Sequence, residues 1–191
     1  MLRIMLVDDT PERAFYLSLV LTQLGYDVVG EISDPRELHD EVLRLSPDAI
    51  IVDTDSPSRD TLENLCTITE SCPRPIVMFA NDPARESIRK AVHAGVSAYV
   101  VDGLAPERIT PILDTAVARF EAFQAMRNEL ATVKNKLSER KIVEKAKGIL
   151  MKSAKLTEEA AYRALRKQAM DRNLQIVEVA RQVIAVSELL G

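Results

Sequence analysis

Several features that would assign this 191-residue chain to a common class are missing from it. Its two cysteines, Cys66 and Cys72, match no metal-binding spacing and have no ligand cluster beside them, so we expect ordinary thiols. Asp8 and Asp9 interrupt the first apolar run, which excludes a secretion signal of the usual form. No apolar stretch approaches the ~20 residues of a membrane-spanning helix. We therefore expect a soluble, cytoplasmic protein with no membrane contact.

Charge is divided unevenly along the chain. Residues 1–120 contain 11 Lys and Arg against 20 Asp and Glu, whereas residues 121–191 contain 14 against 9. Opposite net charges in the two halves indicate two different roles. Because an acidic domain repels phosphate groups, any binding of a polyanion is expected in the C-terminal half.

Short apolar segments alternate with amphipathic helical patterns through residues 1–120. The expected strands are residues 2–7, 26–32, 49–52, 76–79 and 98–101, and the expected helices between them are residues 11–24, 35–45, 60–71 and 83–94. Gly25 and Gly95 are stop signals for two of these helices. Wholly apolar central strands in such an alternation predict a parallel sheet covered on both faces. The fold class is therefore a doubly wound, five-stranded α/β domain, flavodoxin-like in type.

A long helix is expected after the last strand. Pro106 opens it, and from residue 109 to 138 the only helix breaker is Pro111, which falls in the first turn where proline is tolerated. The residues with the 3-4-3-4 spacing of a coiled-coil seam are Phe123, Met126, Leu130, Val133 and Leu137. This pattern favours a homodimer, although a helix lying on its own domain would show the same short stripe.

The C-terminal module, residues 139–190, is expected to be a small all-α domain. Its predicted helices are residues 139–153, 157–171 and 174–189, with Thr157 as an N-cap and Asn173 as a break. Residues 138–172 contain 10 Lys and Arg against 5 Asp and Glu. A solvated helix surface would have the same composition, and Tyr162 is the only aromatic residue of the module available to stack on a base.

Acidic residues follow two of the predicted strands. Asp8 and Asp9 come after the first strand and Asp53 comes after the third, so all of them are expected at one edge of the sheet. Carboxylates gathered in this way repel one another unless a hard cation offsets their charge. Mg²⁺, which prefers oxygen ligands, is the natural candidate.

On these residues, and on the run Asp53-Thr54-Asp55-Ser56-Pro57, the first domain resembles the receiver domain of bacterial two-component response regulators. The resemblance implies that Asp53 is the phospho-acceptor. It also implies that Asp8, Asp9, Asp53 and the backbone carbonyl of Asp55 bind Mg²⁺.

Two residues depart from the receiver pattern. Ala80 stands where the family has Thr or Ser, and Asp102 stands where it has Lys, so Tyr99 keeps the aromatic switch position without its switch partner. An anion at Asp102 disfavours a phosphoaspartate. We therefore expect a bound partner protein, rather than phosphorylation, to control the chain.

The C-terminal module resembles the ANTAR output domain, a three-helix RNA-binding family that causes transcription antitermination. The resemblance is carried by residues 146–151, 157–162 and 165–170. It implies a dimer that binds paired stem-loops in a leader transcript, prevents the terminator hairpin from forming, and catalyses no reaction. The RNA-contact candidates are Lys147, Arg166 and Lys167, with Tyr162 either packed in the core or contacting a base.

Further segments resemble the nitrate/nitrite-assimilation antiterminators of the NasT type. These segments are residues 74–79, 95–99, 111–114, 118–121 and 187–190. The resemblance implies that a nitrate-sensing partner protein holds the regulator inactive until nitrate releases it. Two alternatives stay open: a DNA-binding response regulator controlled by phosphorylation at Asp53, and a protein-interaction module that binds no nucleic acid. Against the first, no short Gly-containing turn precedes a recognition helix.

Overall fold

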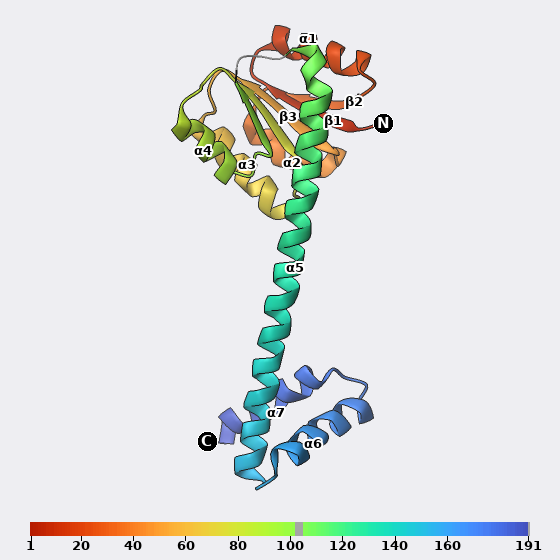
Figure 1. Cartoon of the computed structure of the whole chain (residues 1–191), viewed down its shortest axis with the longest axis vertical. Helices are drawn as coiled ribbons and strands as arrows, with labels where there is room; N and C mark the ends of the chain where they lie inside the picture. Colours follow the sequence, from red (N-terminus) through yellow and green to blue (C-terminus); the bar gives the residue numbers. More distant parts are fainter. Residues whose placement is uncertain (102–104, 191) are drawn as a thin grey trace. The chain divides into compact units, whose positions relative to one another are not determined.

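The computed structural model describes residues 1–101 and 105–190, and these form two compact units, the first ending at Gln124 and the second beginning at Ala125. The first unit contains a parallel sheet with the strand order β2-β1-β3-β4-β5 (Figure 1). Its strands are β1 (Arg3–Asp8), β2 (Asp27–Ile32), β3 (Ala49–Thr54), β4 (Ile76–Ala80) and β5 (Ala98–Val101). The predicted five-stranded, doubly wound fold is confirmed.

Helices cover both faces of this sheet because successive side chains of a strand point to opposite faces. The helices are α1 (Pro11–Gln23), α2 (Leu38–Leu45), α3 (Arg59–Ser71), α4 (Arg85–His93) and α5 (Pro106–Ser153). Within β3, Ile50 and Val52 pack toward α2, α3 and α4, whereas Ala49 and Ile51 pack toward α1 and the first turns of α5. The central strands are apolar throughout because both of their faces are buried.

The ends of these helices follow the local sequence. A single 3₁₀ turn, η1 (Pro35–Glu37), precedes α2, because the Asp34 carboxylate accepts a hydrogen bond from the Arg36 backbone N–H. Gly95 follows α4 with φ of 97°, and a Cβ at this position would lie 2.1 Å from the Thr69 hydroxyl oxygen. The glycine is therefore required both by backbone conformation and by space.

The second unit contains the end of α5 together with α6 (Glu158–Asp171) and α7 (Ile176–Leu190). Helix α5 is continuous over 48 residues, so the predicted boundary between separate helices at residues 138 and 139 is not a break. The sequence there contains no proline or glycine that would end a helix, and Ser138, a possible N-cap, lies inside α5. The predicted N-cap and break are confirmed: the Thr157 hydroxyl accepts a hydrogen bond from the Ala160 N–H, and Asn173 adopts a φ of 52°. The last helix begins at Ile176, two residues later than predicted.

Small and branched apolar residues form the core of the second unit. The buried members are Ala146 of α5, Leu165 and Ala169 of α6, and Val179 and Ala180 of α7. Alanine at three of these positions lets the helices approach closely. The exposed residues of the unit are mostly polar, so its charge lies on its surface.

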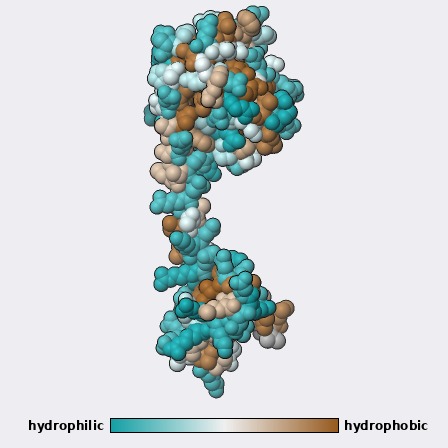
Figure 2. Space-filling model, turned by 90° about the vertical axis from the view of Figure 1, so that its right-hand side faces the viewer, coloured by the Kyte–Doolittle hydropathy of each residue, from teal (hydrophilic) through white to brown (hydrophobic). Residues whose placement is uncertain are grey.

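The predicted seam residues lie on the middle of α5. Phe123, Met126, Leu130, Val133 and Leu137 are between 54% and 63% exposed. Figure 2 shows apolar residues set among hydrophilic ones along this stretch of the helix. The seam is therefore accessible to another chain, and dimerisation stays a prediction. Across the part of the chain that the structure describes, no helix has the length and apolar character needed to cross a membrane.

Candidate functional site

The carboxyl edge of the sheet brings acidic residues together. Asp8 at the end of β1 lies opposite Asp53 of β3 in the parallel register. The Asp8 side chain is fully buried and that of Asp53 is 13% exposed, whereas those of Asp9 and Asp55 are 68% and 78% exposed. These four carboxylates form what we call the acidic pocket. Its inner pair has lost most of its water, so its negative charge must be offset by the protein or by an ion.

The guanidinium of Arg13 lies among these carboxylates. Its Nη2 and Nε donate to the two Asp8 oxygens at 2.9 and 3.0 Å, and Nη2 also donates to Asp9 at 3.0 Å. Its Nη1 donates to Asp55 at 3.2 Å, and its Nε lies 3.4 Å from an Asp53 oxygen. The planar fork of an arginine suits a two-oxygen contact of this kind. One side chain thus supplies positive charge to the whole pocket.

The acidic pocket raises the pKa of its arginine, Arg13, and of one of its carboxyl groups, Asp53. The hydrogen bond to Asp8 is the main cause that raises the pKa of Arg13 above its ordinary value, so this cation is permanent at any physiological pH. Burial raises the pKa of Asp53 to about 6; the charge of Arg13 works against this rise and the charges of Asp8, Asp55 and Asp9 add to it. The Asp53 carboxylate is thus only partly compensated by the guanidinium.

The carboxylates that would hold a divalent metal are already engaged by Arg13. Receiver domains typically bind Mg²⁺ at this edge, and carboxylate oxygens suit it chemically. Here the oxygens of Asp8, Asp53 and Asp55 converge on Arg13, and the Asp55 carbonyl accepts a hydrogen bond from the Asn81 backbone N–H at 3.1 Å. Among the described residues, no three His, Cys, Asp or Glu side chains are placed to hold a metal ion.

The positions that depart from the receiver pattern lie on β4 and β5. Ala80 ends β4 and is 3% exposed, so its methyl group packs in the core and the position offers no hydroxyl. Tyr99 of β5 is partly buried, and its hydroxyl donates to the backbone carbonyl of Asp82 at 2.9 Å. Asp102 lies outside the described residues.

Asp82, which the sequence analysis did not single out, connects several segments around this edge. Its carboxylate accepts hydrogen bonds from Ser87 at 2.6 Å, from the Ala84 N–H at 2.8 Å and from Ser56 at 3.2 Å. These bonds, the one from Ser87 first, lower the pKa of Asp82. Together with the bond from Tyr99, they tie the loop after β3, the loop after β4 and β5 to one residue.

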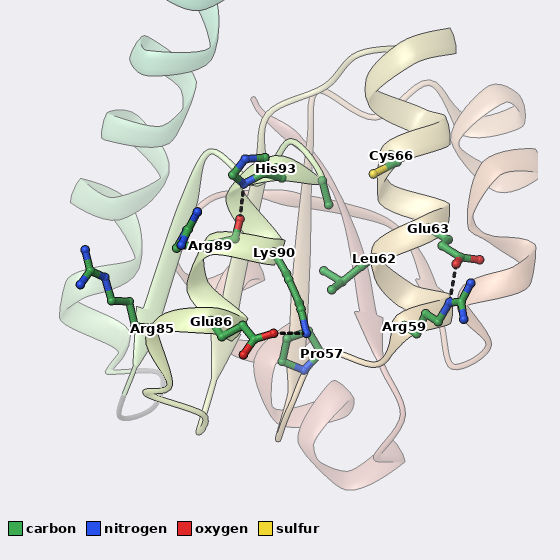
Figure 3. Close-up of a pocket in the computed structure, with 11 residues that line it drawn as sticks. Pro57, Arg59, Leu62, Glu63, Cys66, Arg85, Glu86, Arg89, Lys90 and His93 are labelled. Carbon is green, nitrogen blue, oxygen red and sulfur yellow. Dashed lines mark hydrogen bonds and ion pairs between the residues drawn. The ribbon is translucent and has the colours of Figure 1, made fainter.

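A groove of about 1080 Å³ lies between α3 and α4 (Figure 3). Two ion pairs line it, Arg59 with Glu63 at 2.6 Å and Lys90 with Glu86 at 2.8 Å. No residue of the acidic pocket contributes to this groove. The buried carboxylate of Asp8 lies at the sheet edge and not in this groove. We therefore place the candidate site of the first unit at the sheet edge.

In the second unit, the predicted RNA-contact residues have different surroundings. Lys147 is only 7% exposed, and its ammonium donates to Glu144 and to Glu158, each at 2.8 Å. Those hydrogen bonds, the one to Glu144 first, raise its pKa. Lys147 thus joins α5 to α6, and little of it is available to a ligand.

Arg166 and Lys167, by contrast, are exposed on α6, and within the described chain neither makes an ion pair. Tyr162, one turn earlier on the same helix, is 44% exposed rather than sealed in the core. It borders a groove of about 410 Å³ that is also lined by two cations, Lys136 and Arg140, and two carboxylates, Glu139 and Glu144. An accessible aromatic ring beside guanidinium and ammonium groups is a suitable surface for an unpaired base.

An acidic pocket at the carboxyl edge of a doubly wound sheet, followed by a helical unit with a cationic surface, defines a receiver joined to an output domain. Two family models match accordingly: residues 4–114 match the response regulator receiver domain, and residues 131–184 match the ANTAR domain. The chain therefore belongs to the response regulators of two-component signalling and has an ANTAR RNA-binding output domain. Response regulators whose output is an ANTAR domain are regulators and not enzymes.

Known relatives agree with this assignment. The transcriptional regulatory protein PdtaR of Mycobacterium tuberculosis is 32% identical over 189 residues, which cover 99% of this chain and 91% of PdtaR. The nitrate regulatory protein of Klebsiella oxytoca is 47% identical over 66 residues, which cover 35% of this chain and 17% of that protein. The likeness to PdtaR thus runs through both domains, and the likeness to the nitrate regulator is partial.

Solved structures resemble the receiver. The signal receiver domain of a modulated diguanylate cyclase from Desulfovibrio desulfuricans G20 superposes with a TM-score of 0.57 at 22% identity, over 64% of this chain and 98% of that one. A LuxR-family response regulator from Aurantimonas sp. SI85-9A1 gives a TM-score of 0.54 at 29% identity, over 62% of this chain and 86% of that one. The first of these likenesses concerns the fold alone.

Proposed function

We propose that this chain is an RNA-binding transcription antiterminator that acts as a dimer in the cytoplasm. Its paired ANTAR domains would bind two stem-loops of a leader transcript, so that the terminator hairpin does not form. The observation that carries this proposal is the surface of α6, where Arg166 and Lys167 stand exposed beside a half-exposed Tyr162. The match of residues 131–184 to the ANTAR domain supports the same surface as the output.

The candidate RNA-contact residues would play different roles, according to their chemistry. Arg166 and Lys167 would bind phosphates, because their charges are not already used in ion pairs within the described chain. Tyr162 would stack on a base that is splayed out of a loop, with Arg140 beside it in the same groove. Lys147 is given a structural role, since its charge is already shared by Glu144 and Glu158.

Dimerisation would use the seam on α5. Its five apolar residues are more than half exposed, and a second copy of the same helix would cover them in a short parallel coiled coil. A dimer places two RNA-binding surfaces on one molecule, so the second stem-loop binds at a high effective concentration. The gain in affinity from this second binding event is larger for an RNA target with two hairpins than for one with a single site.

Control by a nitrate-sensing partner protein is proposed in place of control by phosphorylation. The partial likeness to the nitrate regulatory protein of Klebsiella oxytoca supports the nitrate signal. Ala80 offers no hydroxyl to a phosphoryl group, and Tyr99 is tied to Asp82, so the usual readout of a phosphoaspartate is missing. Phosphorylation of Asp53, and Mg²⁺ at Asp8, Asp9, Asp53 and the Asp55 carbonyl, stay predictions.

Charge-removal variants test the RNA surface. Replacing Arg166 and Lys167 together by Ala should weaken binding to a two-hairpin leader RNA and lower the salt dependence, with a slope smaller by about 1 for each lost phosphate contact. Replacing Lys145 and Arg163 together by Ala is the matched control, because it also removes two positive charges but ones that are paired, with Glu188 and Glu159. Equal loss in both proteins would mean that only net charge matters.

Two other functions give different results in the same assay. A DNA-binding regulator would bind duplex DNA better than the hairpin RNA, with the same variants affecting DNA. A pure protein-interaction module would regulate its target in cells even after Arg166 and Lys167 are removed. Either result would replace the antiterminator proposal.

A further inference from the structure

The acidic pocket contains its own cation. The guanidinium of Arg13 contacts four carboxylates, which come from β1, the residue after it, β3 and the loop that follows β3. Its side chain is 27% exposed, so most of it is shielded from solvent. The closest contacts are to Asp8, whose carboxylate has no exposed surface and depends on this guanidinium for its charge partner.

Two physical costs oppose the position of Arg13. It lies in the first turn of α1, where the helix dipole presents positive charge and favours acidic residues. A long side chain also loses rotamer freedom when it is held by several partners. The carboxylates must therefore outweigh both costs, and Arg13 would not be ordered there without them.

We propose that Arg13 is the resident cation of the acidic pocket, and that it competes with any divalent metal ion for the same carboxylate oxygens. Arg13 is part of the chain, so it is present at a fixed, high effective concentration and cannot be removed by a chelator. Mg²⁺ would have to displace the guanidinium from Asp8 and Asp53 before it could coordinate them. The receiver unit should therefore be folded without metal and bind Mg²⁺ weakly. This inference concerns the receiver unit and does not depend on RNA binding.

The test is a titration of the full-length protein with Mg²⁺. Binding is measured by calorimetry and, separately, by the shift of the thermal unfolding midpoint. Arg13→Met keeps an apolar side chain of similar length but removes the charge. We expect its apparent Kd for Mg²⁺ to be lower than that of the wild type by at least about ten-fold. In a chelating buffer the variant should unfold at a lower temperature than the wild type, and Mg²⁺ should restore more of its midpoint.

Arg44→Met is the control for net charge. Arg44 forms an exposed pair with Glu41 near the end of α2, and α2 leads into the start of β3, at the sheet edge opposite the pocket. Its removal should leave Mg²⁺ binding unchanged.

Should Arg13→Met fail to fold, Arg13→Lys supplies the comparison. A single ammonium cannot reproduce the fork, so this variant should also bind Mg²⁺ more tightly than the wild type. Equal Mg²⁺ affinity in the wild type and in a folded Arg13 variant would overturn the proposal, as would an equal gain in Arg44→Met.

Discussion

Replacing Asp53 by asparagine should stabilise the protein at neutral pH. The pKa of Asp53 is about 6 in the folded chain against an ordinary value of 3.8, so burial disfavours its charge more than Arg13 favours it. The folded state then binds an extra proton between these two values. The contribution to stability is fully present below the unfolded pKa and is lost as the pH rises through the folded pKa.

The size of the effect follows from the shift. Each pKa unit corresponds to about 1.36 kcal/mol, so an ionised Asp53 costs the folded state on the order of 3 kcal/mol at neutral pH. Asparagine has nearly the same shape and carries no charge. Asp53→Asn should therefore recover much of this free energy at a pH of about 7.5, and less of it at a pH of about 5, where the native carboxyl is already largely protonated.

Urea unfolding followed by circular dichroism in a chelating buffer measures this difference at both pH values. The substitution leaves the second unit unchanged, so the difference between variants belongs to the receiver. Asp27→Asn, at an exposed position at the start of β2, controls for the change in net charge. If Asp53→Asn were no more stable than the wild type at neutral pH, Asp53 would be compensated by Arg13 and the reasoning about the pocket would be wrong.

Three further predictions concern function. Leu130→Lys should weaken dimerisation and RNA binding together, because burying a charge in a short coiled coil costs several kcal/mol. The control Asn128→Lys lies off the seam and should change neither property. Light scattering measures the dimerisation of both variants, and titration with RNA measures their binding. Tyr162→Ala should weaken RNA binding roughly 5- to 150-fold, the equivalent of about 1–3 kcal/mol for one stacked base, while Tyr162→Phe should keep it. Asp53→Asn should keep its nitrate-dependent regulation in a reporter strain, and loss of that regulation in a folded protein would restore phosphorylation as the control.

Most of the fold can be predicted from the sequence, because periodicity and turn residues each depend on only a few neighbouring positions. Alternation between short apolar runs and amphipathic helices locates every strand of the sheet, and Gly95 and Asn173 mark chain reversals that their positive φ values require. The boundary expected between residues 138 and 139 separates the seam pattern from the helical pattern of the C-terminal module. No residue there interrupts the helix, and α5 continues to Ser153.

The contents of the candidate sites are harder to predict because they depend on residues brought together from different elements. The sequence places Asp8, Asp9 and Asp53 at one edge, but it does not show that Arg13 enters the pocket. An arginine four residues after Asp9, in the first turn of a helix, is the only signal. Similarly, the sequence makes Lys147 a candidate RNA contact, but it does not show that Glu158, 11 residues later, lies beside Lys147 and pairs with its charge.

The most direct test of the antiterminator proposal is equilibrium binding of the full-length protein to a two-hairpin leader RNA and to duplex DNA of matched length, across a series of salt concentrations. The proposal predicts that preference for the folded RNA persists at physiological salt, because stacking of a base on Tyr162 is not screened by salt. Equal, steeply salt-dependent binding to both nucleic acids would contradict it and would reduce the cationic surface of α6 to a nonspecific polycation.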